Sequence, residues 1–137
     1  MNALFSPDNL DLYLRLFLAV LFGWLIGLER ETLGKTAGTR TFALVSLGSA
    51  LFALSSSVGV QPVAAGIGFL GAGLIIFREG RAECLTTAAA LWAVAGLGLL
   101  IGQGQYGLSI FGTALILIVL FLMRVIHPER WKEQNRG

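Results

Sequence analysis

The stretch Gly66-Ile-Gly68-Phe-Leu-Gly71 matches the pattern G-x-G-x-x-G, which in dinucleotide-binding proteins cradles a pyrophosphate. That chemistry needs the pattern between a strand and a helix, with an acidic residue about 20 residues later. Two alternatives are a broken helix that lines a polar pathway and a helix face on which glycines let two backbones approach. We favour helix packing, because Gly66 and Gly73 lie seven residues apart on one stripe, with Gly68 and Gly71 nearby.

Charged and hydroxyl residues gather where apolar stretches begin or end, and ionisable groups at such depths are costly unless paired. One interpretation is a polar site at a common membrane depth, and the other is a set of solvated, salt-bridged turns. Because Gly34 and Gly38 allow a tight return, we expect the carboxylate of Glu29 to pair with the guanidinium of Arg40. The candidate residues are Glu29, Arg30, Arg40, Thr41, Arg78, Glu79, Thr86 and Thr87.

Residues for enzyme chemistry are sparse. The one histidine, His127, has no second His or Cys nearby to complete a metal site. No nucleophile motif or phosphate-binding loop with a lysine is present, so we expect no enzyme, no metal and no cofactor. Cys84 is the only cysteine, and we interpret it as a small buried residue at a helix start in preference to a reactive thiol.

The composition is that of an integral membrane protein. Hydrophobic residues make up 55% of the chain and charged residues 13%, whereas soluble domains carry about 25% charged residues. No Asp, Glu, Lys or Arg occurs between Arg40 and Arg78 or between Glu83 and Arg124. Each of these stretches is long enough for two helical crossings of a bilayer. Their apolar residues do not alternate with polar ones as barrel strands would, which favours helices.

The breaks in hydropathy predict an all-α domain over residues 1–126, followed by a short cytoplasmic tail over 127–137. The third predicted helix would span only about 22 Å, which is less than the hydrocarbon core of about 30 Å. Asp11 and Arg15 have the spacing of an ion pair within the first helix. The five predicted spans are about 10–28, 41–58, 63–77, 85–101 and 106–126.

The basic residues predict the orientation. Nine of the ten lie in the first and third connections or at the end of the fifth span, and Arg15 alone lies inside a span. The positive-inside rule then places the N-terminus outside and the C-terminus in the cytoplasm. These cations would face anionic lipid headgroups and do not imply a nucleic-acid partner. The similar sequences LIGLER (25–30) and LIIFRE (74–79) suggest a parallel tandem repeat of two hairpins.

Several motifs together resemble the membrane domain of the MgtC/SapB family. They are RLFLAVLFGWLIGLERE, AGTRTFALVSLGSALFALSS, GIGFLGAGLIIFREG and LTTAAALW, in order and with matching spacing from Arg15 to Gly104. The resemblance implies a five-helix domain of the bacterial inner membrane. It also implies links to magnesium limitation, acid tolerance and survival inside host cells, and the rotary ATP synthase as a candidate partner.

The chain departs from the longer family members in two ways. Cys84 and Thr86 stand where the family more often has glycine and asparagine, and we expect no soluble C-terminal regulatory domain after Gly137.

Two functions remain open from the sequence. The first is a non-enzymatic membrane modulator that binds another membrane protein or itself through faces of small residues. The second is a small oligomeric transporter or channel for magnesium or another cation, with Glu29, Arg40 and Glu79 lining a cytoplasmic vestibule. The small residues expected to pack helices are Gly23, Gly27, Gly66, Gly68, Gly71, Gly73, Gly98 and Gly102.

Overall fold

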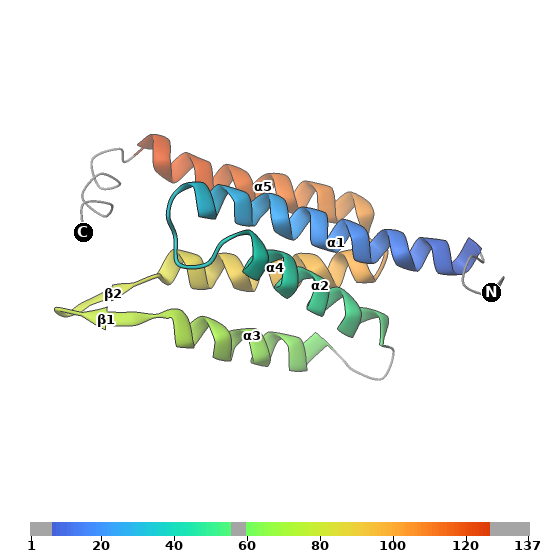
Figure 1. Cartoon of the computed structure of the whole chain (residues 1–137), viewed down its shortest axis with the longest axis horizontal. Coiled ribbons are helices and arrows are strands. Elements are labelled where there is room, and N and C mark those ends of the chain that lie inside the picture. The colour runs from blue at the N-terminus through green and yellow to red at the C-terminus, as the bar shows by residue number, and fades with distance from the viewer. Residues whose placement is uncertain (1–6, 56–59, 127–137) are drawn as a thin grey trace.

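The computed structural model describes residues 7–55 and 60–126, and these form five helices and one two-stranded hairpin (Figure 1). The expectation of an all-helical bundle is therefore confirmed except for the short hairpin between the third and fourth helices. The elements are α1 (Pro7–Thr32), α2 (Thr39–Leu54), α3 (Val60–Leu74), β1 (Ile76–Arg78), β2 (Arg81–Glu83), α4 (Leu85–Gly102) and α5 (Tyr106–Ile126).

The helices lie side by side along one common direction, with α4 packed against each of the other four (Figure 1). α1 begins at one end of the bundle and α5 finishes at the other. We call α1, α2 and α4 the central unit, because these three helices make the most extensive contacts with one another. α3 lies at the edge of the bundle and packs mainly on α4.

Large apolar side chains cover the outer faces of the helices. Phe17, Phe69, Trp92 and Phe111 are each more than half exposed, an arrangement that suits a lipid environment and is rare on soluble monomers. Within the described residues, Asn9–Thr32 and Leu85–Gly102 are long and apolar enough to cross a membrane. Three further apolar helices are shorter, at Thr39–Leu54, Gln61–Leu74 and Tyr106–Leu122.

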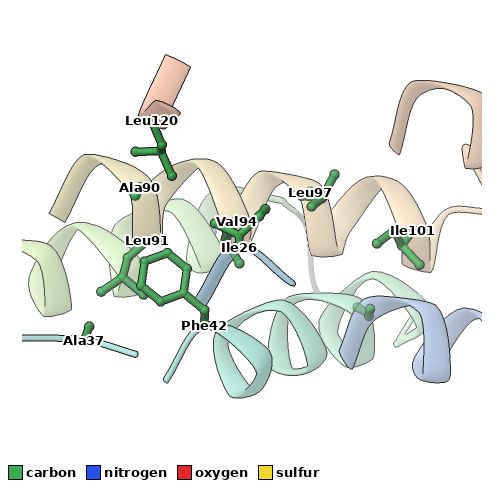
Figure 2. Close-up of a cluster of buried hydrophobic side chains, with 11 residues drawn as sticks. Ile26, Ala37, Phe42, Ala90, Leu91, Val94, Leu97, Ile101 and Leu120 are labelled. Atoms are coloured by element: carbon green, nitrogen blue, oxygen red, sulfur yellow. The ribbon is translucent and has the colours of Figure 1, made fainter. Parts of the chain in front are cut away.

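The core forms around the middle of α4. Phe42 of α2 reaches toward Leu91 and Val94 of α4 and Ile26 of α1, and Leu120 of α5 approaches from the other side (Figure 2). Phe42, Ile26 and Val94 are fully buried. Small residues on α4 let the neighbouring backbones come close enough for these side chains to meet.

The third helix ends at Leu74, three residues before the expected end of the span. Ile76 and Phe77 belong instead to β1, which pairs with β2 in the register Phe77↔Ala82 and Arg78↔Arg81. Glu79 (φ 49°) and Gly80 (φ 77°) both adopt positive φ, as a two-residue hairpin turn requires. The dipeptide Glu-Gly after a β-branched and aromatic run was the signal that could have predicted this hairpin.

The two halves of the suggested tandem repeat adopt different structures. Residues 25–30 lie within α1, which continues to Thr32, whereas residues 74–79 leave α3 and enter β1. The local resemblance of LIGLER and LIIFRE therefore does not extend to backbone structure. The repeat is not supported.

Candidate functional site

A buried arginine joins the end of α1 to the beginning of α4. Arg30 is only 4% exposed. Its Nη2 donates a hydrogen bond to Oγ1 of Thr87 at 3.1 Å, and its Nη1 lies 3.8 Å from Oε2 of Glu29. Of the eight polar residues expected to cluster, the structure brings together Glu29, Arg30 and Thr87.

The charge of Arg30 is only partly compensated by its surroundings. The guanidinium of Arg30 contacts the first turn of α4, where the helix dipole places partial positive charge, so the dipole disfavours it. Glu29 supplies the compensating negative charge, but at ion-pair distance and not at hydrogen-bond distance. Within the described residues, Nε of Arg30 and Oε2 of Glu29 are buried without a hydrogen-bond partner. Removing one charge of such a pair would leave the other without compensation.

The expected pair between Glu29 and Arg40 is wrong. Arg40 is exposed, and Glu29 lies beside Arg30. The carboxylate near the start of α2 is instead Glu31, whose Oε2 accepts hydrogen bonds from the backbone N–H of Thr39 at 2.9 Å and from the Thr39 hydroxyl. Glu31 thereby caps the N-terminus of α2. Sequence reasoning missed this cap because the carboxylate comes from the preceding helix, eight residues away.

The loop between α1 and α2 folds back onto the start of α4. Oγ1 of Thr36 lies 3.1 Å from Sγ of Cys84, and Ala37 is buried. Cys84 is partly exposed and adopts φ 64° at the residue before α4, a conformation that favours glycine. The position at a helix start is as predicted, but Cys84 is partly exposed and not buried, and its backbone conformation was not predicted.

The other candidate polar residues do not join the cluster around Arg30. Arg78 and Glu79 lie in the hairpin and are exposed, and Thr41 and Thr86 are exposed at helix beginnings. The vestibule expected from Glu29, Arg40 and Glu79 therefore does not form within one chain.

A second polar cluster closes the opposite end of the bundle. The predicted ion pair between Asp11 and Arg15 is confirmed. Arg15 also donates to the backbone oxygen of Gly102 at 2.9 Å, and the Tyr106 hydroxyl donates to Asp11. Because Gly102 ends α4 and Tyr106 begins α5, this cluster ties α1 to the α4–α5 connection.

Four of the eight glycines lie where helices cross closely. A Cβ built on Gly98 would overlap the carbonyl oxygen of Ser46, and one on Gly102 would lie 2.7 Å from the carbonyl oxygen of Ala50. Gly23 and Gly27 face α2 at similarly short distances. These positions leave no room for a larger residue without moving backbone.

The glycines of α3 behave differently. A Cβ added to Gly71 would be in ordinary contact with Ala88 at 3.7 Å. A Cβ added to Gly66, Gly68 or Gly73 would have no atom of another described element within 4 Å. The packing role expected for these three is not found within the chain. Because the G-x-G-x-x-G pattern lies inside α3, it does not form a phosphate-binding turn between a strand and a helix.

The described residues contain no group of three His, Cys, Asp or Glu side chains placed to hold a metal ion. His127 and the predicted tail over 127–137 lie outside the described residues.

A bundle of apolar helices, with apolar outer faces and paired charged side chains at both ends, defines a helical membrane protein. The model of the MgtC family matches residues 16–128. The chain belongs to the MgtC family, and the resemblance stated from its motifs is confirmed. No solved structure matches it.

Three relatives illustrate the match. "Protein SrpB" of Synechococcus elongatus is 41% identical over 98% of this chain and 88% of its own length. "Putative magnesium transporter YhiD" of Escherichia coli K12 is 38% identical over 93% of this chain and 66% of its own length. "Protein MgtC" of Salmonella typhimurium is 46% identical over 81% of this chain and 52% of its own length. The chain thus matches most of SrpB but about half to two thirds of the other two.

Proposed function

We propose that this protein is a non-enzymatic modulator in the bacterial inner membrane, which acts by binding a second copy of itself or another membrane protein. It crosses the bilayer five times, with α1 beginning outside the cytoplasm and α5 ending inside. The observation that carries the proposal is that a Cβ added to Gly66, Gly68 or Gly73 of α3 would meet no atom of the rest of the described chain within 4 Å. Glycines on a lipid-facing helix allow the close approach of a partner helix.

The packing of the central unit supports this proposal. Ser46 of α2 lies against Gly23 of α1 on one side and Gly98 of α4 on the other. Helices in backbone contact have little freedom to separate. Activity through the outer surface is therefore favoured over activity through a pathway between these three helices.

The physiological setting is proposed from the family. MgtC relatives connect the chain with magnesium homeostasis, and the family resemblance extends this to growth under magnesium limitation or acid stress. The same resemblance makes the rotary ATP synthase a candidate partner.

A small oligomeric cation transporter is the second candidate. The name of the relative YhiD points to magnesium transport, and one structural feature favours it. Glu29 lies at an open groove of about 350 Å³ between α1 and α5, whose exposed lining is apolar and whose other walls are Leu117, Ile118, Phe121 and Leu122. A carboxylate beside a groove at a helix end could contribute to a cation path completed by further copies.

Leucine substitutions on α3 test the modulator. We expect Gly66→Leu and Gly73→Leu to leave the monomer folded but to abolish partner or self association, measured by crosslinking in native membranes, and growth at low magnesium. Gly107→Leu is the matched control, because Gly107 also has open space around it but lies on α5. Full growth and unchanged crosslinking of the α3 variants would contradict the modulator.

Reconstituted liposomes test the transporter. Magnesium, sodium or proton flux that depends on the protein and is lost in Glu29→Gln would support it. Sealed liposomes that show no flux under all three gradients would exclude it and leave the modulator.

A further inference from the structure

The β1–β2 hairpin projects beyond the ends of the neighbouring helices, in line with α3 (Figure 1). α3 has 15 residues and so spans about 22 Å, which is shorter than the hydrocarbon core of about 30 Å. Each three-residue strand adds about 10 Å. Together α3 and the hairpin span about 32 Å, so the hairpin makes up the length that α3 lacks and brings its turn, with Arg78 and Arg81 beside it, to the boundary between hydrocarbon and headgroups.

Its side chains are exposed in the part of the chain that the structure describes. All six strand residues are exposed, and Phe77 is 77% and Ile76 45% exposed. A hairpin this small is at best marginally stable in water by itself. An aromatic side chain exposed next to the end of a membrane helix is typical of the interface between hydrocarbon and headgroups.

Two arginines on the hairpin form no ion pair within the described residues, although Glu83 shares their face of the hairpin farther from the turn. Arg78 and Arg81 are directly opposite in the register, which places both on one face with Cβ atoms about 5 Å apart, and like charges so placed destabilise a hairpin. Glu79 lies farther out in the turn, and Glu83 is opposite Ile76.

We propose that this hairpin binds the phosphodiester headgroups of anionic lipids at the cytoplasmic surface of the membrane. The guanidinium groups of Arg78 and Arg81 together contact a phosphate, while Ile76 and Phe77 lie at the boundary of the acyl chains. A phosphate accepts charge-assisted hydrogen bonds from both guanidinium groups and removes their mutual repulsion. The inference rests on the orientation in the proposed function and adds a specific lipid contact to it.

The apolar neighbours of the arginines favour lipid over free phosphate. A soluble anion would satisfy the guanidinium groups but would leave Ile76 and Phe77 in water. A lipid supplies a phosphate for the guanidinium groups and acyl chains for the apolar side chains, each at the required depth. It also anchors α3, whose contacts with the rest of the bundle are the least extensive among the first four helices.

Spin labels test the depth of the hairpin. In the Cys84→Gly background, a label at Phe77→Cys should be more accessible to oxygen than to a water-soluble nickel chelate, like a reference label at Phe111→Cys. A label at Glu79→Cys in the turn should show the opposite preference. A label at position 77 that is open to nickel, or shielded from both agents as in a protein interface, would overturn the proposal.

Lipid binding to the purified protein tests the chemistry, with phosphatidylglycerol, phosphatidylcholine and inorganic phosphate as probes. We expect the double variant Arg78→Gln/Arg81→Gln to lose about tenfold in affinity for phosphatidylglycerol. Lys35→Gln, which removes a charge from the other connection at this end, should retain the affinity. Phosphatidylcholine should bind weakly to both.

Equal affinity of the double variant for phosphatidylglycerol would overturn the proposal, and so would displacement of this lipid by inorganic phosphate. Because purified protein and lipid are the only components, the result does not depend on whether the protein modulates a partner. Failure of the lipid site and failure of the modulator are therefore separate outcomes.

Discussion

The central unit and the edge formed by α3 with its hairpin use the same residue types in opposite ways. Gly23, Gly27, Gly98 and Gly102 of the central unit lie against neighbouring backbone, whereas a Cβ added to Gly66, Gly68 or Gly73 of α3 would meet open space. Arg30 is buried against Thr87, while the arginines of the hairpin are exposed. The difference shows that one region holds the fold together, whereas the other exposes its glycines and arginines at the surface.

The two connections at the end of the bundle that carries the hairpin sharpen this contrast. The α1–α2 loop folds inward, with Glu31 capping α2 and Thr36 against Cys84. The α3–α4 connection extends outward as the hairpin (Figure 1). α1 continues as a helix past its apolar run, and Arg30 in this last part donates a hydrogen bond to Thr87 of α4. After α3, β-branched and aromatic residues followed by Glu79-Gly80 favour a hairpin.

The largest expected effect separates the two sets of glycines. Gly98→Val should abolish folded protein, because its Cβ would overlap a backbone carbonyl that cannot rotate away, and overpacking alone typically costs about 1–3 kcal/mol. Gly66→Val should fold normally. The folded fraction of both variants in detergent, measured by size-exclusion chromatography, checks this. Equal yields would remove the distinction between the two regions.

The next effect separates the two kinds of arginine. Arg30→Gln should destabilise the protein by about 3 kcal/mol, because it leaves the buried carboxylate of Glu29 without its counter-charge. Arg78→Gln should leave stability in detergent unchanged. The free energy of unfolding in SDS titrations measures both.

A double-mutant cycle identifies the partner of Glu29. Glu29→Gln should offset part of the loss in Arg30→Gln and should simply add to the small effect of Arg40→Gln. Non-additivity with Arg40 and additivity with Arg30 would reverse this assignment.

A smaller effect is expected at the cap of α2. Glu31→Ala should cost roughly 1 kcal/mol, since the backbone N–H and hydroxyl of Thr39 lose their acceptor. Glu31→Gln, which keeps an acceptor oxygen, should recover part of the loss. Hydrogen exchange of the Thr39 amide gives a local readout, and unchanged protection in Glu31→Ala would contradict the cap.

The smallest effect is expected at Cys84. Cys84→Gly removes the cost of a left-handed conformation for a residue with a side chain, which stabilises the folded protein by about 1 kcal/mol. It also adds conformational freedom to the unfolded chain and removes the contact with Thr36, and both of these effects are destabilising. We expect a change in unfolding free energy within about 1 kcal/mol. A loss well beyond this, with Cys84→Ser as the comparison, would show that the thiol contact is more important than the backbone.

Much of the fold was predictable because its causes are local. Long stretches without charge indicate helices in a membrane, since each helix satisfies its own backbone hydrogen bonds. Asp11 and Arg15 pair because residues four apart share a face of the same helix. The glycines at positions 23, 27, 98 and 102 were expected to pack helices, and they lie at close crossings.

Only the tertiary structure decided which arginine is buried and which glycines have neighbours. Arg30 and Arg40 both lie next to apolar runs, and whether each is buried depends on how its helix, α1 or α2, is rotated within the bundle. Gly66 and Gly98 share the same chemistry, but α3 lies at the edge of the bundle while α4 lies at its centre. Helix period and hydropathy are properties of one segment, whereas burial and pairing depend on the rotation and neighbours of every helix in the bundle.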